Sequence, residues 1–172
     1  MIQKYSRYRI LELFFRCPNK IFHIREISRL SKLAVPSVKI HLDELIKENL
    51  VLKSKEGLYG GHKASINQNF KLLKQQNTVL ILNLGCVKYI EDEIMPKSIV
   101  LYGSASIGED DEESDIDLFI ESKEIDLDLS KFEKILNRKI HLFFKENFKD
   151  LSKELKNNII NGIVLSGFLE GY

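Results

Sequence analysis

Long apolar runs are absent from this sequence, and cysteine is scarce. No run approaches the ~20 apolar residues that a membrane-spanning helix needs, so we expect no bilayer span. The N-terminal residues carry scattered charges and no small-residue cleavage site, which argues against a signal peptide. The two cysteines, Cys17 and Cys86, lie far apart and form no metal or redox spacing. These features together predict a cytoplasmic protein whose cysteines are reduced.

Net charge is also nearly missing, at +1 over the 172 residues. This balance hides a division, because residues 1–66 hold 13 Lys and Arg against six Asp and Glu, a net of +7. Residues 67–172 hold 13 Lys and Arg against 19 Asp and Glu, a net of −6. Such asymmetry indicates a polyanion as partner of the first half and cations as partners of the second. The alternative is that both halves are merely solvated surfaces.

The first half has apolar residues at helical spacing in three stretches, which cover residues 6–16, 25–33 and 36–50. Pro36 suits the first turn of the third stretch, because the first N–H groups of a helix have no partner and proline has none to leave unpaired. Residues 50–66 then indicate two short strands around a glycine-containing turn. This order of three helices and a hairpin resembles the winged helix-turn-helix family over residues 1–68.

In that family the third helix enters the major groove of duplex DNA, and the wing contacts phosphates. The resemblance therefore implies base-facing residues at the start of the third helix, which here are Ser37, Lys39 and Ile40. It implies phosphate contacts from the hairpin, where the candidate residues are Lys53, Lys55, His62 and Lys63. The excess positive charge favours DNA binding and transcription regulation over a protein-interaction or purely structural module.

Residues 70–95 predict one long connecting helix, which Pro96 ends. Its apolar residues form two stripes, one through Leu84 and the other through Leu82. A helix with two apolar stripes is buried on two sides. We expect the second stripe to face the first domain or a second subunit, and we therefore predict a homodimer.

The second half opens with a short apolar strand at residues 98–102, which runs into Gly103 and Ser104. A glycine at this point lets the backbone come close to a bulky group. A helix that begins at Ser104 directs N–H groups toward that group, and this geometry suits a phosphate.

A second strand is expected from Asp115 to Glu121. Because side chains alternate along a strand, those of Asp115 and Asp117 lie on one face and those of the apolar residues between them on the other. Two carboxylates one pleat apart repel each other unless a cation lies between them. A hard divalent ion such as Mg2+, shared with substrate phosphates, meets this need.

These residues, with a further glycine at 108 and the run Ser-Asp-Ile-Asp-Leu, resemble the signature of the DNA-polymerase-beta-like nucleotidyltransferases, particularly the minimal nucleotidyltransferases. The resemblance covers about residues 95–145 and implies a mixed sheet flanked by helices and a two-metal nucleotidyl transfer. It assigns the triphosphate of a nucleoside triphosphate to Gly103 and Ser104, and the metal, Mg2+ or Mn2+, to Asp115 and Asp117.

The sequence departs from that family at one position. The family has a third carboxylate on a later strand, and residues 139–144 supply such a strand, but His141 occupies the position. A histidine titrates near neutrality and can act as a base, so His141 is a candidate catalytic residue. It is a poor ligand for Mg2+, which prefers oxygen. A histidine without a role is the alternative, and the acidic residues available to replace the carboxylate are Glu121, Asp126, Asp128 and Glu146.

The whole sequence predicts an α+β protein. It consists of a winged helix-turn-helix (1–68), a connecting helix (69–95) and a mixed-sheet, nucleotidyltransferase-like α/β domain (96–172). Three functions stay open: a DNA-bound regulator whose second domain binds nucleotide and metal, an enzyme, and a structural repressor that has lost the site. The enzyme would transfer NMP from an NTP to a protein or nucleic acid hydroxyl, and the resemblance includes antitoxins that act beside a toxin chain. His141 disfavours the enzyme and the retained motif disfavours the repressor, so we expect the first function.

Overall fold

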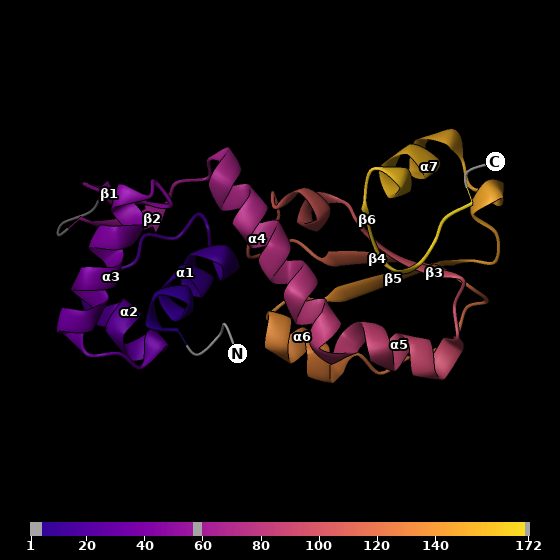
Figure 1. Ribbon diagram of the computed structural model, residues 1–172, viewed down its shortest axis with the longest axis horizontal. Coiled ribbons are helices and arrows are strands. Elements are labelled where there is room, and N and C mark those ends of the chain that lie inside the picture. The colour runs from indigo at the N-terminus through magenta and orange to yellow at the C-terminus, as the bar shows by residue number, and fades with distance from the viewer. Residues whose placement is uncertain (1–4, 57–59, 171–172) are drawn as a thin grey trace. The chain divides into compact units, whose positions relative to one another are not determined.

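The computed structural model describes residues 5–56 and 60–170, and the chain divides into two compact units (Figure 1). The first unit runs to Lys71 and the second begins at Leu72. Within the described ranges, no helix combines the length and the apolar character needed to cross a membrane.

The first unit consists of three helices and a β-hairpin. Its elements in chain order are α1 (Ser6–Arg16), α2 (Ile24–Ser31), α3 (Val35–Lys47), β1 (Val51–Ser54) and β2 (Gly61–Ala64). The two strands pair antiparallel, and the turn residues 57–59 between them lie outside the described residues. Apolar residues three or four apart give each helix one inner face, and these faces meet in a core that contains Ile10, Phe14, Ile27, Val38, Leu42 and Leu45. The structure confirms the predicted order of helices and hairpin.

The stretch predicted as one connecting helix is broken in the structure. It consists of α4 (Gln68–Ile81), a π-helical segment η2 (Leu82–Cys86) and α5 (Val87–Ile94). Gly85 interrupts the helical backbone with a φ of 154°. Side-chain-bearing residues rarely adopt such a φ, so this glycine marks the bend.

The bend accounts for the two apolar stripes. Leu82 and Cys86 from one stripe, and Val87 and Ile90 from the other, are all buried in a single core of the second unit. Among the apolar residues of the two stripes, only Leu84 is exposed, with an exposed fraction of 63%. Both stripes are therefore buried within the second unit. The apolar surface that suggested a second subunit is already covered, and the homodimer stays a prediction.

The second unit is built on a mixed four-stranded sheet with the order β5-β4-β3-β6. Its strands are β3 (Ser98–Tyr102), β4 (Ile116–Glu121), β5 (Ile140–Lys145) and β6 (Ile163–Gly167). β3 pairs antiparallel with β4 and with β6, while β4 and β5 run parallel. The elements between the strands are η3 (Ser104–Ile107), α6 (Ser130–Leu136), η4 (Phe148–Asp150) and α7 (Lys153–Ile160). This mixed sheet agrees with the predicted α+β class.

Alternating side chains give the sheet two apolar faces. On one face, Leu101 and Leu118 belong to the core that includes residues of α5 and α6. On the other, Val100 and Phe119 pack with Ile159 of α7. Figure 1 shows α5 and α6 on one side of the sheet and α7 on the other. Because helices cover both faces, the polar side chains of the central strands gather at the strand ends.

Candidate functional site

The backbone of Gly103 lies against the carboxylate of Asp117. Antiparallel pairing sets Tyr102, the last residue of β3, opposite Asp117, the second residue of β4. Gly103 follows with a φ of 71°, and a Cβ atom at this position would lie 2.7 Å from Asp117 Oδ2. Only glycine meets both conditions without strain. The structure therefore brings the aspartate carboxylate close to this backbone, and the predicted approach to a phosphate stays a prediction.

The turn after Gly103 is a short 3₁₀ helix, η3, which begins at Ser104. The hydroxyl of Ser106 donates a hydrogen bond of 2.7 Å to the Gly103 carbonyl, and the Ser106 N–H donates to the same oxygen at 3.1 Å. Gly108 ends the turn in the left-handed conformation. The first N–H groups of such a turn have no carbonyl within it to bind. The turn thus leaves backbone N–H groups without an internal partner at the end of β3, and phosphate binding there stays a prediction.

The two aspartates of the motif lie where β4 begins. The strand starts at Ile116, one residue later than predicted, so Asp115 directly precedes it. Ile116 and Leu118 are buried, Asp115 is exposed, and the side chain of Asp117 is 31% exposed. Burial thus alternates over residues 115–118 as predicted, while the placement of both carboxylates on one face stays a prediction.

His141 stands beside Asp117. The parallel register of β4 and β5 makes the two residues direct neighbours. Their side chains meet with 3.2 Å between His141 Nδ1 and Asp117 Oδ1, and that of His141 is 60% exposed. Gly103, Asp117 and His141 thus come together from three consecutive strands or strand ends. An imidazole held in this way by a carboxylate leaves its second nitrogen free to exchange a proton with a bound group.

The loop before Asp115 is held by its own hydrogen bonds. Asp111 Oδ1 accepts from the Ser114 hydroxyl at 2.8 Å, from the Ser114 N–H at 3.1 Å and from the Glu113 N–H at 3.1 Å. The hydrogen bond from the Ser114 side chain is the main cause of a pKa of Asp111 below its usual value. Asp115 and Arg138 both line an open cavity of about 500 Å³ next to this loop. The sequence pattern had given no sign of Arg138, because it comes from the segment after α6.

No cluster of three or more His, Cys, Asp and Glu suited to an ion is found among residues 5–56 and 60–170. Glu121, one of the residues considered as a third carboxylate, lies at the far end of β4 from Asp117. It therefore does not replace the acidic residue whose position His141 occupies.

Residues 86–165 match the family model described as a nucleotidyltransferase domain. No curated protein and no solved structure matches the chain.

This chain contains a nucleotidyltransferase domain.

The match confirms the resemblance of the second half to the polymerase-beta-like nucleotidyltransferases and extends it on both sides of the predicted residues 95–145. It includes the motif residues from Gly103 to Asp117 and His141. It does not reach the first unit, so the winged helix-turn-helix stays a prediction.

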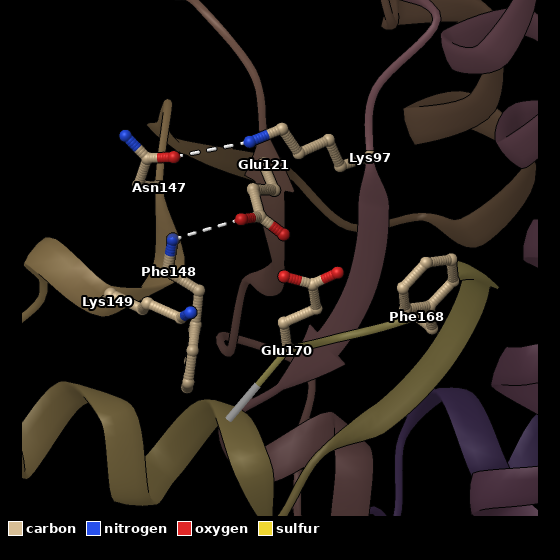
Figure 2. A pocket seen from close by; sticks show the side chains of 7 residues that line it. All are labelled: Lys97, Glu121, Asn147, Phe148, Lys149, Phe168 and Glu170. Carbon is tan, nitrogen blue, oxygen red and sulfur yellow. Dashed lines mark hydrogen bonds between the residues drawn. The ribbon is translucent and has the colours of Figure 1, made fainter. Parts of the chain in front are cut away.

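A cavity at the other end of the central strands is separate from the motif residues of the nucleotidyltransferase domain (Figure 2). Its volume is about 280 Å³, and Glu121 lies in its wall. The Glu121 carboxylate is buried and accepts hydrogen bonds of 3.1 Å from the Ser98 hydroxyl and the Phe148 N–H. At the rim, Lys97 donates to the side chain of Asn147 at 3.2 Å. These bonds join β3, β4 and the segment after β5, which indicates a structural role for Glu121.

Four of the residues predicted to bind DNA surround one hollow of the first unit. Lys39 of α3, Lys53 and Lys55 of the β1 side and His62 of β2 line a cavity of about 630 Å³. The remaining three lie elsewhere: Ser37 is half-buried, Ile40 is 60% exposed, and Lys63 forms an ion pair of 2.9 Å with Glu56.

His62 does not bring the positive charge that we expected of it. Burial lowers its pKa, and the charge of Lys53 lowers it further. Because an ordinary histidine titrates near 6.5, a lowered pKa leaves His62 neutral at pH 7. Its backbone also joins the hairpin to Phe22, with which it exchanges hydrogen bonds of 2.8 and 2.9 Å. Lys39, Lys53 and Lys55 are therefore the cationic side chains of this hollow, and Asp43 is its acidic one.

We predict that Gly103→Ala destabilises the second unit, because the new methyl group meets Asp117 and the backbone keeps a positive φ. The cost should be roughly 1–3 kcal/mol, and each kcal/mol lowers the melting temperature of a chain this size by roughly 2–4 °C. Thermal unfolding followed by circular dichroism measures it. Ser104→Ala is the control and should stay within about 0.5 kcal/mol of the wild type. Equal stability of the two variants would contradict the close approach.

Proposed function

We propose that this protein binds a nucleoside triphosphate together with a divalent cation at the ends of β3 and β4, and that its first unit binds duplex DNA. The observation that carries the nucleotide site is the approach of the Gly103 backbone to the Asp117 carboxylate. It puts N–H donors for phosphate and an oxygen ligand for a cation next to each other. A nucleotide bound as its metal complex satisfies both.

The residues present fit a hydrated divalent ion that shares phosphate oxygens with the nucleotide. Asp115 and Asp117 are the ligands that we propose, because Mg2+ commonly takes one or two carboxylates plus phosphates and water. The ion would supply charge neutralisation and polarisation at the phosphates. One Asp117 oxygen already contacts His141, which leaves Oδ2, the oxygen next to Gly103, for the ion. Mn2+ tolerates an imidazole in its surroundings better than Mg2+ does.

A second function, transfer of NMP to a hydroxyl of a protein or a nucleic acid, is favoured by one specific contact. The carboxylate of Asp117 faces His141 Nδ1 at 3.2 Å. A carboxylate that accepts the Nδ1 proton keeps Nε2 unprotonated, and Nε2 can then take the proton of an attacking hydroxyl. His141 would act in this way as a general base in place of the third carboxylate. The proton leaves the hydroxyl as its oxygen bonds to the α-phosphorus, and the pyrophosphate departs.

DNA binding by the first unit rests on charge and on the arrangement of α3 and the hairpin. Lys39, Lys53 and Lys55 surround one hollow, and Ile40 near the start of α3 is exposed. A helix that carries exposed residues beside a lysine-lined hairpin is the arrangement that a winged helix-turn-helix uses on DNA. The net charge of +7 over residues 1–66 supports a polyanionic partner.

The aspartates give the sharpest test of the nucleotide site. Asp115→Asn/Asp117→Asn should abolish metal-dependent ATP binding, measured by titration calorimetry with Mg2+ and with Mn2+, because the amides cannot neutralise the ion. Asp92→Asn/Glu93→Gln removes the same charge from exposed positions of α5 and should bind ATP like the wild type. Equal ATP binding by the two double variants would show that Asp115 and Asp117 are not the metal ligands.

Changes at His141 separate binding from transfer. His141→Asp should tighten Mg2+ binding, because it supplies the oxygen ligand that the ion prefers. His141→Gln should keep ATP binding and lose any transfer of label from α-labelled NTP to protein, DNA or RNA. Brisk wild-type transfer with Mg2+ that neither change affects would show that His141 has no role.

The lysines of the first unit test DNA binding. Lys39→Gln/Lys53→Gln/Lys55→Gln should weaken binding to duplex DNA, and the slope of log affinity against log salt should fall by roughly three, one per lost phosphate contact. Lys20→Gln/Lys32→Gln/Lys47→Gln removes the same charge elsewhere in the unit and serves as control. Fluorescence anisotropy at several salt concentrations measures both. An equal loss of DNA affinity in the two triple variants would show that the hollow contributes only through the net charge of the unit.

A further inference from the structure

Helix α4 is tied to the loop that joins the two halves of the nucleotide site. Lys74 Nζ lies 2.8 Å from Asp110 Oδ1 and also donates to the Asp110 carbonyl. The neighbouring side chain of Gln75 donates to the Ser106 carbonyl in η3. Ser106 and Asp110 belong to the segment between Gly103 and Asp115. Two consecutive residues of α4 thus hold this segment at two points.

The ion pair at the centre of this contact is buried. The exposed fraction of the side chain is 3% for Lys74 and 4% for Asp110, and Arg138 Nη2 approaches the second Asp110 oxygen at 3.7 Å. Burial also holds the pKa of Lys74 below its usual value. Apolar residues in such a place generally give equal or greater stability than a buried ion pair. What the ion pair adds is a fixed geometry, because a buried charge that moves away from its partner is left uncompensated.

That geometry is transmitted along the loop to the site. Asp110 is followed by Asp111, whose carboxylate accepts the three hydrogen bonds from residues 113 and 114. Asp115 comes next. On the other side, Ser106 binds the Gly103 carbonyl through its hydroxyl. The donors at the end of β3 and the carboxylates of β4 are therefore connected to α4 by an unbroken series of short contacts.

We propose that Lys74 and Gln75 are positioning residues of the nucleotide site, which set the loop from Ser104 to Asp115 in its binding geometry. The inference rests on the proposed function of that site. Both residues precede the segment that matches the nucleotidyltransferase domain, which begins at residue 86. The site of this chain is accordingly completed by a helix that the matched segment does not include.

The test compares ATP binding in the presence of Mn2+ by full-length variants. Gln75→Ala removes one hydrogen bond from a half-buried side chain, and Lys74→Met removes the charge with little change of shape. Each should weaken ATP binding about tenfold, since a site that is no longer held in place must be ordered on binding. Lys74→Arg keeps the charge and should recover most of the affinity. Ile159→Ala, in the core on the α7 side of the sheet, is the control for lost stability and should leave the affinity within about twofold.

Amide hydrogen exchange of the ligand-free proteins gives a second readout. Gln75→Ala should speed exchange in residues 104–115 and leave the exchange of β3 and β5 unchanged. If Lys74→Met does not fold, Gln75→Ala decides alone. Wild-type affinity in Gln75→Ala, or an equal loss in Ile159→Ala, overturns the positioning role while the nucleotide site stands. Absence of ATP binding by the wild type itself overturns the proposed function, and this inference with it.

Discussion

The close approach of a backbone to a carboxylate organises this second unit. Where β3 and β4 run side by side, Gly103 turns the chain away from the sheet, and the missing Cβ leaves room for Asp117. The sheet order, with β4 between β3 and β5, brings His141 to the other side of the same carboxylate. One oxygen of Asp117 then faces an imidazole and the other faces the turn at Gly103.

The contact with Asp117 explains the position of the His141 side chain, which its exposure alone does not. A histidine that is 60% exposed at the edge of a sheet has no constraint of packing to explain it. Its contact with Asp117, with 3.2 Å between Nδ1 and Oδ1, places it beside the motif. Under the proposed function, a cation bound by Asp117 would compete with His141 for the same carboxylate.

The parts of this picture that the sequence predicts are those that depend on local pattern. Alternation along residues 115–121 and the glycine after a buried strand give the motif and its faces, because both follow from strand geometry. The bend at Gly85 could not be predicted in this way, because the apolar spacing on both sides of it fits one continuous helix. β6 escapes it as well, because Ile163–Gly167 becomes a strand only by pairing with β3. Lys74 and Asp110 are 36 residues apart, and no spacing rule connects them.

The hairpin of the first unit shows what a prediction from residue type alone leaves out. Among the hairpin residues expected to contact phosphates, burial leaves His62 neutral and Lys63 is paired with Glu56. Lys39, Lys53 and Lys55 line the hollow together with Asp43. The partners that we propose for the two units differ accordingly, a polyanion for the first and a cation bound with phosphates for the second.

The central claim is that a metal–nucleotide complex lies between the Gly103 turn and the β4 carboxylates. Paramagnetic broadening of amide NMR signals by Mn2+ in the presence of ATP tests it most directly, because broadening reports distance from the ion. The account predicts broadening centred on Asp115 and Asp117 and reaching Ser104 and His141, dependent on ATP. Broadening confined to the acidic loop at residues 109–113, or equal with and without ATP, would contradict it.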